Sequence, residues 1–150
     1  MEKYLGVKLI EAEPMTRGDY NKFKGWKIPE NENPNDEGYI VKYSDDYISW
    51  SPREAFEEAY REIHGLTFGL AVEALKKGYK VARTGWNGKG MFVYYVPTNT
   101  YTTVTGVAKN HFGDQVTINA YFSIKNVNDT VSTWVPSIND CLAEDWLIVE

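Results

Sequence analysis

A glycine-rich loop between two predicted strands holds the residues of this sequence that are best suited to bind an anionic ligand. The segment Gly85–Gly90 reads GWNGKG. Glycine has no Cβ, so the backbone N–H groups of Gly88 and Gly90 can approach a phosphate closely. Trp86 offers a flat face for a base or a sugar. A simple turn with Trp86 packed in the core uses the same glycines, and this alternative stays open.

Side chains around the loop add charge and hydrogen-bonding groups. Arg83 and Lys89 provide two cations and Asn87 provides an amide, all within seven positions. Phe92, on the strand that follows, belongs to the same predicted ligand-binding set. We expect the loop N–H groups to bind phosphate together with Lys89 or Arg83, although Arg83 also fits an ordinary surface position at a strand end.

A second polar group follows another predicted strand. Asp140 could accept hydrogen bonds from two ribose hydroxyls, while Ser137 and Asn139 could bind amide or base edges. We expect Asp140 to lie on the ribose side of the ligand, away from its phosphates. The alternative is a polar turn whose side chains cap the segment Cys141–Glu144.

No catalytic set accompanies these residues. The two histidines, His64 and His111, lie in different parts of the chain, and there is no Gly-x-Ser-x-Gly motif. The neighbours of Cys141 do not favour a thiolate. Acid–base chemistry by carboxylates such as Glu144 and Asp145 stays open, with a solvated acidic turn as the simpler reading. We therefore expect a binding protein that uses no cofactor and no metal, not an enzyme.

Charge and composition narrow the classes of partner. The net charge of −5 argues against a general DNA or RNA binder, which needs a basic face. Cys141 is the only cysteine, so we expect no internal disulfide, no thiolate zinc site and a reducing compartment. The first residues lack the apolar run of a signal peptide, and no segment is long enough to span a bilayer. A cytoplasmic protein without a membrane partner is the expectation.

The apolar pattern predicts two domains, residues 1–64 and 66–150, both α+β. In the first we expect a loop at Ile28–Gly38 and a helix that Ser51 caps and His64 and Gly65 end. The expected strands are Lys3–Glu11, Tyr39–Tyr43 and Tyr47–Trp50.

In the second domain, Thr67 is predicted to cap a helix that buries Phe68, Ala71, Val72 and Leu75 and stops at Gly78. This helix should pack on an antiparallel sheet. The strand Met91–Val96 is apolar on both faces, which favours cover by a second copy of the chain. The expected strands are Tyr79–Arg83, Met91–Val96, Tyr101–Val107, Gln115–Ser123, Val131–Val135 and Asp145–Val149.

The segment Leu66–Glu150 resembles a small phage and prophage domain, the second type of Thoeris anti-defence protein. The matching pieces are TFGLAVEALKKGYKVARTGWNGKGMFVYYVP and STWVPSINDCLAEDWLIVE. The resemblance implies a protein that binds a cyclised ADP-ribose signal, made by bacterial TIR-domain enzymes, and holds it without cleaving it. Some members of that family also hold cyclic oligonucleotide signals. The resemblance further implies a homo-oligomer, a dimer or tetramer with pockets between subunits, in the cytoplasm of the infected bacterium.

Carried over residue by residue, the tryptophan of the family's glycine loop falls on Trp86. Asn87 and the polar turn Ser137–Asp140 also match its pattern. Two departures stand out. About 65 residues precede the domain, and they look like another small phage domain of unknown role. The family often has a threonine or a second Asp-rich pattern before Cys141, so Asn139 is expected to alter the ligand preference.

Two other functions stay open. One is a protein-interaction inhibitor, in which the acidic first domain occludes a host enzyme and the second serves as a scaffold. The other is a phosphodiesterase that acts on the same nucleotides. The fate of a nucleotide incubated with the protein separates all three.

Overall fold

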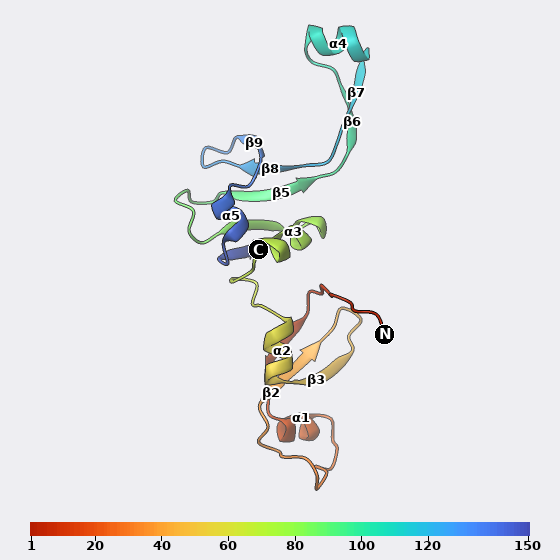
Figure 1. Ribbon diagram of the computed structural model, residues 1–150, viewed down its shortest axis with the longest axis vertical. Coiled ribbons are helices and arrows are strands. Elements are labelled where there is room, and N and C mark those ends of the chain that lie inside the picture. Colours follow the sequence, from red (N-terminus) through yellow and green to blue (C-terminus); the bar gives the residue numbers. More distant parts are fainter. The chain divides into compact units, whose positions relative to one another are not determined.

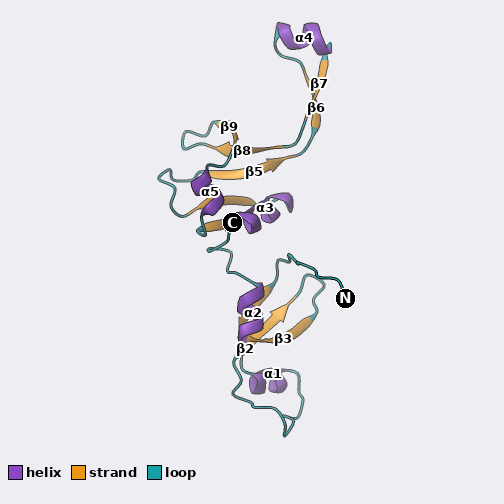
Figure 2. Cartoon of the chain, in the orientation of Figure 1, coloured by secondary structure: helices purple, strands orange, loops and turns teal.

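The computed structural model describes residues 1–150, which form two compact units, Met1–Arg61 and Glu62–Glu150. Both units combine helices with antiparallel sheets, so the expected α+β class is confirmed (Figures 1 and 2). The second unit begins before residue 66 because the segment ahead of it bonds to the last strand. The N–H of Ile148 donates to the carbonyl of Ile63, and Leu66 exchanges two backbone hydrogen bonds with Trp146.

The first unit has a three-stranded antiparallel sheet in the order β1-β2-β3. Its strands are β1 (Glu11–Pro14), β2 (Gly38–Lys42) and β3 (Ile48–Pro52). The predicted hairpin is confirmed, since β2 and β3 pair in register with Ile40 opposite Trp50. Two short helices complete the unit, α1 (Arg17–Phe23) and α2 (Arg53–Ala59).

Three sequence-based expectations for the first unit were wrong. The predicted strand Lys3–Glu11 does not form, because pairing with β2 begins only at Glu11. Ser51 does not cap α2; it lies in β3 opposite Tyr39, and the helix starts after Pro52 without a side-chain cap. The same helix ends at Ala59, well before His64.

Glu32 fixes the long loop between α1 and β2. Its carboxylate accepts hydrogen bonds from Arg17 at 2.7 and 3.0 Å and from the Asn21 amide at 3.0 Å. The hydrogen bonds from Arg17, followed by that from Asn21, lower the pKa of Glu32 to about 2. Arg17 also lies over the ring of Trp50, 5.0 Å from its centroid. The Glu32 carboxylate therefore ties the loop to α1, and Arg17 connects α1 to the sheet.

The second unit has a five-stranded antiparallel sheet in the order β10-β4-β5-β8-β9. The first and last strands of this unit, β4 and β10, pair along their whole length. The strands are β4 (Lys80–Arg83), β5 (Phe92–Val96), β8 (Tyr121–Lys125), β9 (Val131–Trp134) and β10 (Trp146–Val149). The predicted strands at these places are confirmed.

Helix α3 (Phe68–Lys76) packs on one face of this sheet, as predicted. The hydroxyl of Thr67 caps it by accepting from the N–H of Leu70 at 3.4 Å. Gly78 follows the helix with φ +92°, a backbone conformation that favours glycine. The helix buries Ala71, Ala74 and Leu75 against core residues of the strands.

The two faces of the five-stranded sheet differ, because successive side chains on a strand point to opposite sides. Val81, Val93 and Ile124 lie under α3 and are buried. On the other side of β5 and β8, Phe92, Tyr94 and Lys125 remain half-buried. The helix-free face thus carries aromatic side chains that the unit does not fully cover.

A slender arm projects from this sheet (Figure 1). It consists of β6 (Asn99–Thr102) paired with β7 (Gln115–Ile118), with α4 (Gly106–Phe112) at its tip. The predicted strand Tyr101–Val107 was wrong beyond Thr102, since Thr105 caps α4 through the N–H of Ala108. The predicted strand Gln115–Ser123 is in fact β7 and β8, which belong to different sheets.

Apolar side chains on the arm point to solvent. Helix α4 buries none of its residues. Val104 is 93% exposed, Val107 83% and Phe112 58%. No helix anywhere in the protein has the length and apolar character needed to cross a membrane.

Candidate functional site

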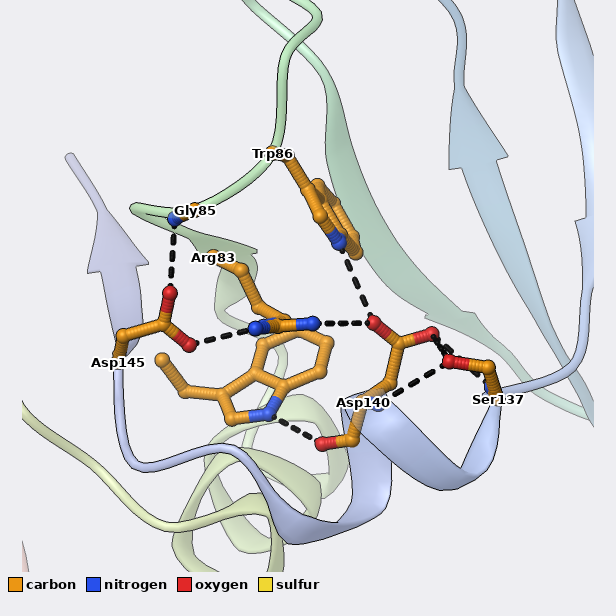
Figure 3. Close-up of polar contacts among 7 residues, drawn as sticks. Arg83, Gly85, Trp86, Ser137, Asp140 and Asp145 are labelled. Carbon is orange, nitrogen blue, oxygen red and sulfur yellow. Dashed lines mark hydrogen bonds and ion pairs between the residues drawn. The ribbon is translucent and has the colours of Figure 1, made fainter.

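Arg83, at the end of β4, joins two carboxylates beside the glycine loop (Figure 3). Its Nε donates to Asp145 at 2.8 Å, and a terminal nitrogen donates to Asp140 at 2.9 Å. These two hydrogen bonds, the one to Asp145 first, raise the pKa of Arg83 above its ordinary value. The predicted phosphate-binding cation is therefore engaged by two carboxylates of its own chain.

Asp140 accepts hydrogen bonds at both carboxylate oxygens (Figure 3). One oxygen receives Arg83 and the indole N–H of Trp86 at 3.3 Å, and the other receives the backbone N–H and the hydroxyl of Ser137 at 2.9 Å each. Burial by itself raises the pKa of Asp140, but the hydrogen bonds from Ser137, Arg83 and Trp86 outweigh it and the pKa lies below its usual value. A ribose would have to displace one of these donors to reach Asp140.

The turn before Asp140 is a helix N-terminus. Helix α5 (Ile138–Leu142) starts after Ser137, whose hydroxyl accepts from the N–H of Asp140 at 3.1 Å while Asp140 accepts from the N–H of Ser137. This reciprocal capping box matches the alternative reading of the segment. Asn139 is exposed on the same short helix. The ribose-binding role of this turn stays a prediction.

Trp86 is half-buried against two other tryptophans. Its ring meets Trp146 edge-on at 5.4 Å and Trp134 edge-on at 6.3 Å, and the latter two rings are 5.9 Å apart. The indole N–H of Trp146 donates to the backbone carbonyl of Asp140. Trp86 is therefore oriented by packing and by a hydrogen bond, and part of its surface stays accessible to a ligand.

The loop after Trp86 keeps a run of backbone donors free. None of the N–H groups from Asn87 to Gly90 donates to another part of the chain, whereas the N–H of Gly85 donates to Asp145 at 2.7 Å. Gly90 has φ +72° and its Cβ side is open apart from the ammonium of Lys125 at 3.7 Å. At Gly88 the Cβ side is filled by Met91 and Val127, so close packing also requires glycine there.

Lys125 is a cation close to the glycine loop that sequence reasoning missed. It lies on β8 directly opposite Phe92 of β5, and its ammonium forms an ion pair with Asp129 at 2.7 Å. No local signal could have found it, because only the β5–β8 register brings it to the loop. Lys89, the predicted loop cation, is exposed and forms no ion pair.

Apart from Asn139, which is exposed on α5, the predicted residues fall into three groups. Four of them form one network: Arg83, Trp86, Ser137 and Asp140. Asn87, Gly88, Lys89 and Gly90 adjoin it in the loop. Phe92 is outside the network: it lies on the sheet face opposite α3, beside Lys125, and the ammonium of Lys80 stands 5.3 Å from its ring centroid.

Chemically, this arrangement combines free N–H donors, a cation and a held indole. The carboxylates of Asp140 and Asp145, which bond to Trp86 and to the N–H of Gly85, are both engaged by Arg83. Nowhere do three or more His, Cys, Asp or Glu side chains gather in a way that could hold a metal ion. The geometry is suited to recognising a group that is anionic on one side and flat on the other.

A family model described as the Thoeris anti-defense 2-like domain matches residues 66–149. The chain belongs to the Thoeris anti-defense 2-like family. A relative named "Thoeris anti-defense 2", from Bacillus phage SP01, is 37% identical over 84 residues, which cover 56% of this chain and 94% of the relative. Both matches confirm the resemblance seen in the sequence.

Membership of the Thoeris anti-defense 2-like family assigns the chain to anti-defence against the Thoeris system. The matched range lies inside the second structural unit, and it contains the tryptophan loop, the Arg83 network and the arm. The first unit lies outside the match. Every predicted ligand-binding residue is therefore within the family domain.

Proposed function

We propose that this protein binds a cyclic ADP-ribose-type immune signalling nucleotide, holds it without cleaving it, and so blocks Thoeris defence in the cytoplasm of the infected bacterium. The observation that carries the proposal is the free N–H run from Asn87 to Gly90 beside the half-buried ring of Trp86. Backbone N–H groups bind phosphate well, and an indole can stack on a base. Membership of the Thoeris anti-defense 2-like family supports the biological context.

Within this proposal, the Arg83 network has a positioning role. Arg83 links Asp145, just before β10, to Asp140 on α5, and Asp140 in turn holds the indole of Trp86. A fixed indole loses little rotational freedom on binding, so more of the contact energy is available for affinity. Lys89, which has no carboxylate partner, is the cation of the loop itself.

Retention without turnover fits the state of the nearby carboxylates. Hydrogen bonds from Arg83 lower the pKa of Asp145, and the pKa of Asp140 is lowered as well. Both groups stay ionised near neutral pH, and a general acid must be protonated to act. As general bases they are weakened by the lowered pKa and by the donors that occupy both oxygens of each carboxylate, so they are suited to positioning rather than to proton transfer.

Assembly as a dimer or tetramer belongs to the same proposal. The helix-free sheet face presents half-buried aromatic residues such as Phe92 and Tyr94, and the arm exposes Val104, Val107 and Phe112. Exposed apolar surface that is not covered by the chain itself commonly marks an interface. A second copy would cover these surfaces and bring another chain close to the loop.

The fate of bound nucleotide tests the proposal. The purified protein is incubated with the product of a TIR-domain enzyme, freed of unbound nucleotide by gel filtration and then denatured by heat. Recovery of intact nucleotide in near-stoichiometric amount is the expected result. A chemically changed product would instead indicate the phosphodiesterase, and no retention would favour the protein-interaction inhibitor. A cyclic dinucleotide incubated in parallel tests whether a second signal class is held.

A further inference from the structure

Lys125 has the position of a ligand-binding cation, although its distance from the loop in sequence hides it. Its side chain is only 23% exposed, so the aliphatic stem is held by the sheet while the ammonium reaches the glycine loop. The ammonium lies 3.7 Å from the point where a Cβ on Gly90 would stand. A Cβ at residue 90 would therefore stand in ordinary van der Waals contact with this cation.

Three cations near the loop differ in what already binds them. Arg83 is engaged by two carboxylates, one of them the largely buried Asp140. Lys89 is exposed and unpaired, so its position is not fixed by packing. Lys125 is fixed along its stem, and its only carboxylate partner is Asp129, which is 84% exposed in a turn. An exposed ion pair contributes little free energy, so a ligand anion can replace Asp129 at the ammonium easily.

The donors beside Lys125 suit a phosphate. The free N–H groups from Asn87 to Gly90 supply neutral donors, and the ammonium supplies the charge. Charge-assisted hydrogen bonds to phosphate oxygens are stronger than neutral ones. A carboxylate with one negative charge competes poorly with a pyrophosphate group for such a cluster.

We propose that Lys125 binds the pyrophosphate group of the ligand at Gly90, and that Asp129 is the counter-ion which the pyrophosphate replaces. This inference rests on the proposed function and deepens it by placing the phosphate end of the nucleotide. Lys89 then adds a second, mobile cation at the same end. Arg83 and Asp140 take no part in phosphate contact.

The two partners of this ion pair should have opposite effects when they are changed. Lys125→Gln removes the cation and should weaken the binding of cyclic ADP-ribose roughly tenfold or more, the effect of losing one hydrogen bond to a charged group. Asp129→Asn releases the cation from its competitor and should strengthen binding by up to about fivefold. Residue 129 has φ +63°, a conformation that asparagine adopts readily, so this change preserves the turn.

Isothermal titration of the full chain with cyclic ADP-ribose, and separately with inorganic pyrophosphate, tests the inference. The arm supplies a matched control in the exposed ion pair Lys109–Asp114, so Lys109→Gln and Asp114→Asn should leave both affinities unchanged. Lys125→Arg keeps the charge and should retain most of the affinity. Thermal unfolding of each variant separates a lost contact from a lost fold.

The outcomes distinguish this inference from the proposed function. Wild-type affinity in Lys125→Gln, in a protein that does bind cyclic ADP-ribose, overturns the role of Lys125 and leaves the proposed function standing. Weaker binding by Asp129→Asn overturns the exchange of counter-ions. Pyrophosphate binding that needs Lys125, without any nucleotide binding, supports the phosphate site and overturns the proposed function. Binding of neither probe overturns both.

Discussion

At the scale of single residues, Arg83 and Asp140 decide how the site is built. Asp140 is contacted from the N-terminus of its own helix α5 and, across more than 50 positions of sequence, from the adjoining end of β4 and glycine loop. Its lowered pKa reflects how many donors converge on it. Changing either partner of this ion pair should therefore disturb the loop as well as the sheet.

We predict that Asp140→Asn destabilises the second unit by about 3 kcal/mol, the scale expected when one partner of a largely buried ion pair is neutralised. The pKa values of Asp140 and Asp145 are lowered on folding. Their stabilisation is therefore complete above the ordinary Asp pKa of about 4 and is lost as pH falls through the lowered values. Urea unfolding between pH 7 and pH 3 measures both effects.

The acid dependence provides the control for that prediction. In Asp140→Asn the loss of stability below about pH 4 should be shallower than in the wild type, because one of the two titrating groups is gone. An equally steep loss would mean that other carboxylates determine the acid lability. Wild-type stability at pH 7 would contradict a structural role for the ion pair.

Trp86→Ala should weaken binding of cyclic ADP-ribose by about 1–3 kcal/mol if the indole stacks on the base. Since Trp86 also packs on Trp134 and Trp146, the melting temperature should fall as well. Trp26→Ala, in the first unit, removes an indole that is 55% exposed and serves as the matched control. Unchanged affinity in a folded Trp86 variant would rule out stacking.

Much of the candidate site could be seen in the sequence, but the partners of its residues could not. The glycine loop with Trp86 was recognisable because glycines and an aromatic residue stand together. The pairing of Arg83 with Asp140 was not, because 57 positions separate them. Arg83 and Asp140 were each predicted to contact the ligand, because a sequence does not show which charged side chains form ion pairs with one another.

At the scale of elements, the helices and strands with a strong local sequence pattern were predicted, and elements without such a pattern were missed. Helix α3 was clear from the cap at Thr67 and its apolar spacing. Helix α1 was missed because seven residues with few apolar positions give no periodic signal. The β-branched residues around Val104 and Val107 suggested a strand. Both side chains are exposed on the arm, so they were not selected for burial in a sheet.

The arm leads to a prediction about assembly. Val107→Glu combined with Phe112→Glu should lower the oligomeric mass without unfolding the chain, because α4 buries none of its residues in the monomer. Multi-angle light scattering after gel filtration measures the mass. Lys109→Glu, on the same helix, changes the charge without removing apolar surface and should keep the wild-type mass. A monomeric wild type at micromolar concentration would contradict the proposed assembly.

The loop between α1 and β2 gives a prediction for the first unit. Glu32→Gln should lower its melting temperature, because the bonds to Arg17 and Asn21 fix that loop. The lowered pKa of Glu32, about 2, means that its contribution is present above the ordinary pKa of about 4.3 and is lost as pH falls toward 2. Glu30→Gln, two positions away, should have no such effect. Melting curves followed by circular dichroism at pH 7 and pH 3 are the measurement.

At the scale of the whole molecule, the family domain and the preceding unit have separate cores. The second unit includes the backbone bonds from Ile63 and Leu66 to β10, so a fragment that starts at residue 62 keeps them. We predict that residues 62–150 fold alone and bind cyclic ADP-ribose within about twofold of the full chain, since all residues proposed to bind it lie there. Titration of both proteins tests this. A large loss of affinity would show that the first unit takes part in binding.

The three indoles of Trp86, Trp134 and Trp146 also give the molecule a built-in optical reporter. Rings held edge-on at 5.4 to 6.3 Å exchange excitation energy efficiently, so light absorbed by any of them is shared among all three. A base that stacks on Trp86 would quench the emission of the whole cluster and alter its near-ultraviolet dichroism. Trp26 and Trp50 belong to the other unit and would supply a constant background. Unlabelled protein would then report the arrival of its ligand in real time.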